Sequence, residues 1–236
     1  MIGRLLVPDV WFYGLVGLGV GVLLRCAGHW LLQRRAKQEN SLPLALAPAP
    51  RPPCSPAPPP RWMALVTGTG FSALWLRYGP STQTVVVSAY FGILLLIFVL
   101  DIEHRWVPNV LLLPTALLAL AVSVFTRDPP LLSALLGGIA GFVWFYLMAM
   151  ACRSALGAGD VKLAGVIGLM TGFPGVLTAL TLGILIGGGG AALLLISGQK
   201  TCKSYIPYAP FLVTGAFLTL VFGTQIVSEF SSLSGR

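Results

Sequence analysis

Two of the seven acidic residues in this sequence lie at positions where a carboxylate is costly, which makes them the candidates for chemistry. Asp101 ends the apolar run VVVSAYFGILLLIFVL, and Asp160 follows the stretch ALGAG and opens the next apolar segment. A charge beside hydrocarbon must be paired, hydrated or kept neutral, so carboxylates in such positions are functional candidates by default. The other acidic residues lie near segment ends or in a basic segment, where solvation accounts for them.

Two carboxylates that share a site cannot both ionise easily, so one holds a proton while the other accepts one. Aspartic proteolysis needs this asymmetry: the ionised member activates a water, and the protonated member polarises the scissile carbonyl. If the helices that carry Asp101 and Asp160 touch, the two side chains face one another at similar depth. Taken alone, each aspartate is more often an interfacial or helix-capping residue, and composition and spacing leave that alternative open.

The elements that must position these aspartates are membrane helices. The 236 residues are 56% hydrophobic and only 9% charged, with a mean hydropathy of +0.86, which excludes a soluble globular surface. In hydrocarbon a chain satisfies its backbone hydrogen bonds as helices or closed barrels, and long continuous apolar runs favour helices. We therefore predict an all-α, polytopic membrane protein of about eight transmembrane helices, at 10–32, 62–76, 84–100, 109–125, 131–151, 161–173, 175–197 and 207–228.

The segment between the first two apolar runs has a different composition. It contains the proline-rich stretch PAPRPPCSPAPPP, which predicts an extended, polyproline-like linker without helix over residues 33–61. Residues 1–32 then form a retained first transmembrane helix, because the apolar stretch is too long for a signal-peptide core. Residues 62–236 form the transmembrane core that carries both aspartates.

Lysine and arginine are unevenly distributed between the two sides of the predicted topology, which sets its orientation. The richer side receives Arg34, Arg35, Lys37, Arg51, Arg61, Arg105, Arg153, Lys162, Lys200 and Lys203. The other side receives Arg4, Arg77, Arg127 and Arg236. The linker and both aspartates are thus predicted to face the cytoplasm, with the termini on the opposite side.

The net charge of +8 does not indicate nucleic-acid binding. The basic residues mostly lie in short gaps between apolar runs and form no cluster interleaved with aromatic residues.

The four cysteines give no indication of a metal site or a disulfide. They are widely separated and form no C-x-x-C pair of the kind that zinc sites use: Cys26, Cys54, Cys152 and Cys202. We expect no metal and no cofactor.

The residues around the two aspartates resemble the motifs of the type IV prepilin peptidase family, membrane aspartic proteases of the GxGD type. The segment DIEHRWVPN, from Asp101 to Asn109, is similar to the family's first motif, and GAGDVKLA, from Gly157 to Ala164, is similar to its second. A weaker similarity is PYAPFLVTGA, Pro207 to Ala216, which looks like the start of the family's last helix. The resemblance covers roughly residues 62–225.

The resemblance implies an activity and a set of site residues. Asp101 and Asp160 become the catalytic pair. The remaining motif positions, which concern substrate approach, are Gly157, Gly159, Lys162, Pro108 and Asn109. The implied substrate is a type IV prepilin or a type II secretion pseudopilin, cut after a glycine that follows a short basic leader at the cytoplasmic face of the bacterial inner membrane.

The sequence departs from the family in one place. Many bacterial members carry two C-x-x-C pairs between their first two spans, associated with zinc binding and with methylation of the new N-terminus. Here that interval holds only Cys54, so the methyltransferase activity is not carried over.

Two other functions stay open: an ion-coupled transporter, since buried carboxylates also relay protons, and an inactive pilus or secretion assembly factor of the same fold.

Overall fold

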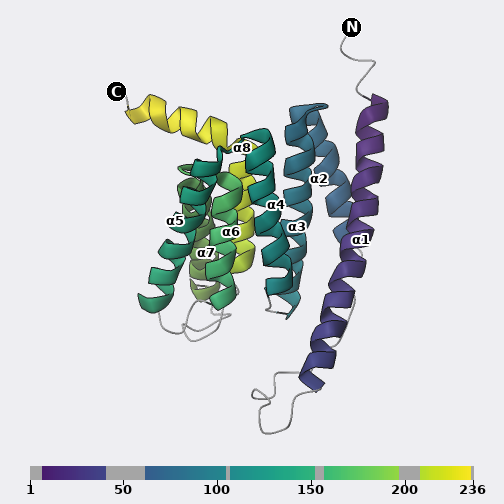
Figure 1. Ribbon diagram of the computed structural model, residues 1–236, viewed down its shortest axis with the longest axis horizontal. Coiled ribbons are helices and arrows are strands. Elements are labelled where there is room, and N and C mark those ends of the chain that lie inside the picture. The colour runs from purple at the N-terminus through teal and green to yellow at the C-terminus, as the bar shows by residue number, and fades with distance from the viewer. Residues whose placement is uncertain (1–6, 41–61, 105–106, 152–156, 197–207, 235–236) are drawn as a thin grey trace. The chain divides into compact units, whose positions relative to one another are not determined.

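The computed structural model describes residues 7–40, 62–104, 107–151, 157–196 and 208–234 (Figure 1), and within them every regular element is an α-helix. The helices are α1 (Val7–Asn40), α2 (Trp62–Tyr78), α3 (Thr82–His104), α4 (Asn109–Thr126), α5 (Leu131–Ala151), α6 (Ala158–Thr171), α7 (Gly175–Ile196) and α8 (Ala209–Ser234). The predicted all-α fold is confirmed. In the described residues, α1, α3, α4 and α5 are long and apolar enough to cross a membrane, so a total of eight spans stays a prediction.

Two predicted boundaries differ from the structure. Helix α1 continues to Asn40, so the prediction of an extended segment from Gln33 onward is wrong for residues 33–40. The physical reason is local: QRRAKQEN contains no proline and is rich in residues that favour helix. Residues 41–61, which hold the prolines, lie outside the described part of the chain. Helix α3 extends to His104, so Asp101 lies inside its last turn rather than after its end.

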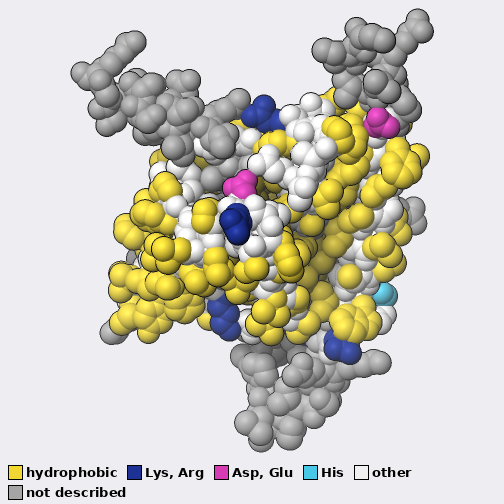
Figure 2. Space-filling model, turned by 45° about the horizontal axis from the view of Figure 1, so that its top comes forward, with side chains coloured by type: hydrophobic (Ala, Val, Ile, Leu, Met, Phe, Trp, Pro, Cys, Tyr) yellow, Lys and Arg dark blue, Asp and Glu magenta, His cyan; other side chains and the backbone are white. Residues whose placement is uncertain are grey.

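On the face that Figure 2 shows, the surface of the described residues is largely apolar. Large side chains such as Trp11, Leu132 and Phe125 are 72%, 69% and 86% exposed. Exposed apolar area on this scale is covered by a partner or by lipid, and the length and hydropathy of the helices favour lipid. The protein is therefore a multi-pass membrane protein.

The chain divides into two compact units, Met1–Leu100 and Asp101–Arg236. In the first unit, α1 packs along α2 at small residues: a Cβ added at Gly17 would meet Phe71 and the carbonyl oxygen of Thr67 at 2.8 Å. The Tyr13 ring lies 4.8 Å from that of Trp75. The boundary between the units falls inside α3.

In the second unit α6 is the central helix, and it packs against α4, α5, α7 and α8. It has 14 residues, about 21 Å of helix, which is shorter than a hydrocarbon core of about 30 Å. Eight of these residues are buried, including Asp160 in the first turn. A short helix enclosed by four others brings its N-terminal end, with any charge there, inside the protein.

Glycines let α5 and α6 approach backbone to backbone. A Cβ added at Gly168 of α6 would run into the backbone of Gly137, and one added at Gly141 of α5 would meet the carbonyl oxygen of Ala164 at 2.5 Å. Small residues at such contacts are the usual means of tight helix association in membranes, where no hydrophobic effect drives helices together. This packing fixes the position of α6, and with it the position of Asp160.

Candidate active site at the start of helix α6

Asp160 is the third residue of α6, with its side chain buried to 4% exposure. The Gly157 N–H donates a hydrogen bond to Asp160 Oδ2 at 3.2 Å, and the Asp160 N–H donates to the Gly157 carbonyl oxygen at 3.0 Å. The first of these bonds is half of a capping box, and the helix N-terminus favours a negative charge at this position. The helix-capping role that the sequence left open is thus real.

Capping does not settle the charge of Asp160, because burial acts in the opposite direction. Asp160 precedes the apolar part of α6, and burial raises the pKa of its carboxyl from 3.8 to about 6, while the hydrogen bond from Gly157 lowers it. Such a carboxyl changes its charge near the pH at which most enzymes work. Titration in that range is what a general base needs and what a purely structural cap does not need.

The two glycines of the second motif have different structural roles. Gly157 has φ −79° and ψ 148°, an ordinary extended conformation that needs no glycine. Gly159 is different, because a Cβ added there would lie 3.1 Å from the Cβ of Val107, which belongs to the first motif. At Gly159 the missing side chain lets one motif pack directly on the other.

A hydrogen bond also joins the two motifs. Lys162 Nζ donates to Asn109 Oδ1 at 3.1 Å, between side chains that are both exposed. Asn109 begins α4, directly after Pro108, whose carbonyl oxygen accepts from the Leu111 and Leu112 N–H groups at 3.0 and 3.2 Å. Pro108 is buried and caps α4 through its backbone. The tail of the first motif therefore lies against the first turn of α6.

Asp101 lies in the last turn of α3 and is 6% exposed. It belongs to the same compact unit as Asp160. Both aspartates are thus buried carboxylates at helix ends, one at a C-terminal end and one at an N-terminal end, as the sequence predicted. Of the predicted site residues, the structure brings Gly157 into contact with Asp160 and Asn109 into contact with Lys162.

Sequence reasoning gave no role to Tyr208, although α8, the helix that follows it, packs against α6. The tyrosine directly precedes α8, and its ring centroid lies 6.0 Å from that of Phe145 and 6.2 Å from that of Phe211. In the sequence, Tyr208 stands at the start of an apolar segment, within PYAPFLVTGA, which looks like the start of the family's last helix.

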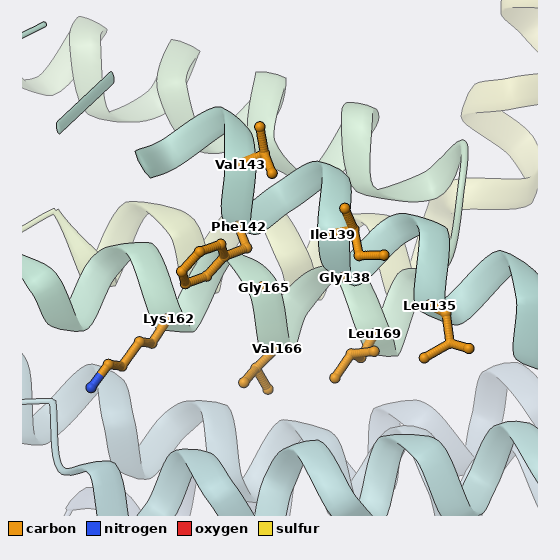
Figure 3. A pocket seen from close by; sticks show the side chains of 9 residues that line it. All are labelled: Leu135, Gly138, Ile139, Phe142, Val143, Lys162, Gly165, Val166 and Leu169. Atoms are coloured by element: carbon orange, nitrogen blue, oxygen red, sulfur yellow. The ribbon is translucent and has the colours of Figure 1, made fainter. Parts of the chain in front are cut away.

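An apolar groove runs between α5 and α6 (Figure 3), with Lys162 and Phe142 at one end and Leu135 and Leu169 at the other. Its lining holds no carboxylate and one charged side chain, that of Lys162. The groove therefore lacks the chemistry of proteolysis. Among the described residues, no group of three or more His, Cys, Asp or Glu side chains is arranged to hold a metal ion.

Apolar helices with two buried carboxylates at helix ends define a class, the polytopic membrane proteins with buried acidic residues. Within that class, residues 88–197 match the type IV leader peptidase family. This segment includes both aspartates and every other residue of the two motifs. This part of the chain, which carries both motifs, is thus similar to the type IV leader peptidase family.

Curated proteins from several bacteria are similar to the chain as well. A prepilin leader peptidase/N-methyltransferase of Bacillus subtilis is 27% identical over 170 residues, which cover 72% of this chain and 68% of the relative. The proteins of the same name from Xanthomonas campestris and Pseudomonas aeruginosa are 25% and 27% identical, over 68% and 60% of this chain. The matched segments cover 55% and 51% of those two relatives, so the chain spans about half to two thirds of the length of its relatives. No solved structure matches the chain.

Proposed function

We propose that this protein is a membrane aspartic endopeptidase that removes the leader peptide of a type IV prepilin or a type II secretion pseudopilin. The observation that carries the proposal is the contact between the two motifs. Gly159 packs against Val107, and Lys162 donates to Asn109, within the compact unit that buries Asp101 and Asp160. A structural role for either aspartate alone gives no reason for the surrounding segments to be joined in this way.

In this proposal the two carboxylates have different tasks. Asp160 is the ionised member, because it lies at the N-terminal end of α6, where the helix dipole and the Gly157 N–H favour negative charge. Asp101 holds the proton, because it lies in the last turn of α3, where the carbonyl end of the helix opposes negative charge. Asp160 then takes a proton from water, the water attacks the scissile carbonyl, and Asp101 polarises that carbonyl. The leaving amine receives its proton from the pair.

The substrate and the side of the membrane are inferred from charge and from the relatives. The relatives carry the name prepilin leader peptidase, which supports a prepilin or pseudopilin substrate. The lysine and arginine counts support a cytoplasmic position for the start of α6 and the end of α3. A substrate with a short basic leader retains that leader on the same side. We therefore place the cleavage at the cytoplasmic face of the bacterial inner membrane.

We further propose that this chain is a peptidase without N-methyltransferase activity. The support is the interval between the first two apolar segments, in which Cys54 stands without a C-x-x-C partner. Mass spectrometry of the mature pilin's N-terminus tests the proposal. An unmethylated N-terminus supports it, and a mass increase of one methyl group that depends on this chain contradicts it.

Co-expression of the chain with a prepilin tests the peptidase activity, with the leader followed by electrophoretic mobility. The Asp101→Asn and Asp160→Asn variants keep the shape of each side chain and remove its charge. We expect both to leave the leader uncleaved. Asp9→Asn, at an exposed aspartate in the first turn of α1, is the matched control and should process the prepilin normally. Normal processing by either variant would contradict the proposed catalytic pair, and normal processing by both would favour a transporter or an assembly factor.

A further inference from the structure

The apolar groove between α5 and α6 takes no part in the proposed cleavage, and Lys162 stands at one end of it (Figure 3). Its volume is about 390 Å³, within the range of roughly 300 to 1,000 Å³ that is usual for ligand sites. Gly138 and Gly165 face each other in its lining: a Cβ added at either would lie 3.5 or 3.6 Å from the carbonyl oxygen of the other. The two helices therefore approach closely along the groove, which makes it narrow.

The wall that α5 contributes to this groove is open at the surface, whereas the α6 wall is covered. The side chains of the α5 wall are between 41% and 61% exposed: Leu135, Ile139, Phe142 and Val143. On the α6 side, Val166 is buried. Helix α5 is long and apolar enough to cross a membrane, so hydrocarbon chains are the molecules that surround the opening.

Lys162 is the one polar side chain in the lining of the groove, and its charge is available to a ligand. It is exposed, and its Nζ donates to Asn109 Oδ1, an uncharged acceptor that leaves further N–H donors of the ammonium group to offer. Asp160 lies two residues earlier, and residues so spaced do not face each other on a helix. The Asp160 carboxylate instead accepts from the Gly157 N–H. The groove thus combines apolar walls with a single positive charge at one end.

We propose that this groove binds an acyl chain of an anionic phospholipid, whose phosphate is held by Lys162. The occupant meets no hydrogen-bonding side chain other than Lys162, which suits an acyl chain and excludes an extended peptide, whose backbone groups would stay unpaired. A linear chain also fits a narrow groove better than a helix of about 10 to 12 Å diameter does. The positive charge at one end complements an anionic headgroup, as in other basic sites between membrane helices. This binding does not rest on the proposed function.

Photo-cross-linking in phosphatidylcholine vesicles tests the role of the charge. The full-length protein is reconstituted with a trace of phosphatidylglycerol or phosphatidylcholine that carries a diazirine in one acyl chain, and mass spectrometry identifies the labelled residues. We expect phosphatidylglycerol to label Phe142 and Leu169 about fivefold more than phosphatidylcholine does. Lys162→Met, which keeps the apolar stem, should abolish this preference, and Arg127→Gln, at an exposed arginine that follows the other end of α4, should retain it. Equal labelling by both lipids in the parent, or a preference that survives in Lys162→Met, would overturn the proposal.

A second pair of variants tests the groove itself. Ile139→Trp fills the groove from its open side and should remove the label from Phe142 and Leu169, whereas Leu132→Trp, at an exposed α5 residue outside the lining, should keep it. Added prepilin should leave the lipid label in place. Replacement of that label by cross-links to the prepilin would assign the groove to the substrate helix and contradict the proposal. Because no readout depends on cleavage, lipid labelling in a protein that cleaves no prepilin refutes the proposed function alone.

Discussion

The last turn of α3 and the first turn of α6 each present one buried aspartate, but they present it at opposite ends of a helix. At Asp101 the helix ends with carbonyl oxygens that oppose a negative charge, and at Asp160 it begins with N–H groups that favour one. Two residues of the same type are thereby made chemically different before any substrate arrives. In the proposed mechanism, this difference in helix polarity assigns the role of base to Asp160 and the role of acid to Asp101.

The two glycines that flank Ala158 form a second contrast, and Gly159→Leu should give the largest effect among the substitutions outside the aspartates. Its side chain would meet Val107, whose Cβ lies 3.1 Å from the ideal Cβ position, and would push the two motifs apart. We expect at least a hundredfold loss of kcat/KM, since small displacements of catalytic groups are costly. Partial recovery of activity in the Gly159→Leu, Val107→Ala double variant would identify this contact as the cause. Full activity in Gly159→Leu alone would show that the motifs need not touch.

The pH dependence of prepilin cleavage tests whether Asp160 is the base of the pair. The pKa of Asp160 is raised by burial to about 6, and the ionised form is the proposed base. Cleavage should therefore be steady above this pKa and fall about tenfold for each pH unit below it. Initial rates of prepilin cleavage in proteoliposomes between pH 4.5 and 8 give the profile. Activity that rises on acidification through this range would mean that Asp160 acts as the acid.

Removal of the hydrogen bond between the motifs should have a moderate effect. Lys162 and Asn109 are both exposed, so the bond competes with water and contributes little in isolation. We expect Lys162→Met and Asn109→Leu each to lower kcat/KM by about three- to tenfold, and the double variant to be no worse than either single one. Additive losses in this double-mutant cycle would show that the two side chains act independently.

Gly157→Ala should give the smallest effect. The backbone of Gly157 is extended, and the hydrogen bond to Asp160 comes from its N–H, which alanine retains. We expect kcat/KM to change by about twofold or less, because the only loss is that alanine is a weaker N-cap residue than glycine. A loss as large as that in Gly159→Leu would remove the distinction that the structure draws between the two glycines.

Much of this arrangement could be predicted from the sequence, since long apolar runs separated by polar residues determine where membrane helices lie. The contacts between the two motifs were harder to predict. The contact of Val107 with Gly159 and the bond between Asn109 and Lys162 join positions about fifty residues apart, and nothing in either local segment encodes the partner. The position of Tyr208, between the rings of Phe145 and Phe211, depends on how the helices pack, and in the sequence it looks like an ordinary aromatic residue. The end of α1 was misjudged because the effect of the prolines was extended into a helix-favouring segment without any.

Cleavage of a purified prepilin by the purified, membrane-reconstituted protein tests the central claim most directly. The fragments are identified by mass spectrometry, and the parent protein is compared with Asp101→Asn, Asp160→Asn and the Asp9→Asn control. The account predicts one cut at the junction of leader and mature pilin by the parent and the control, and no cut by either of the other two variants. Cleavage at the same junction by the Asp101→Asn or the Asp160→Asn variant, at the rate of the parent, would contradict it.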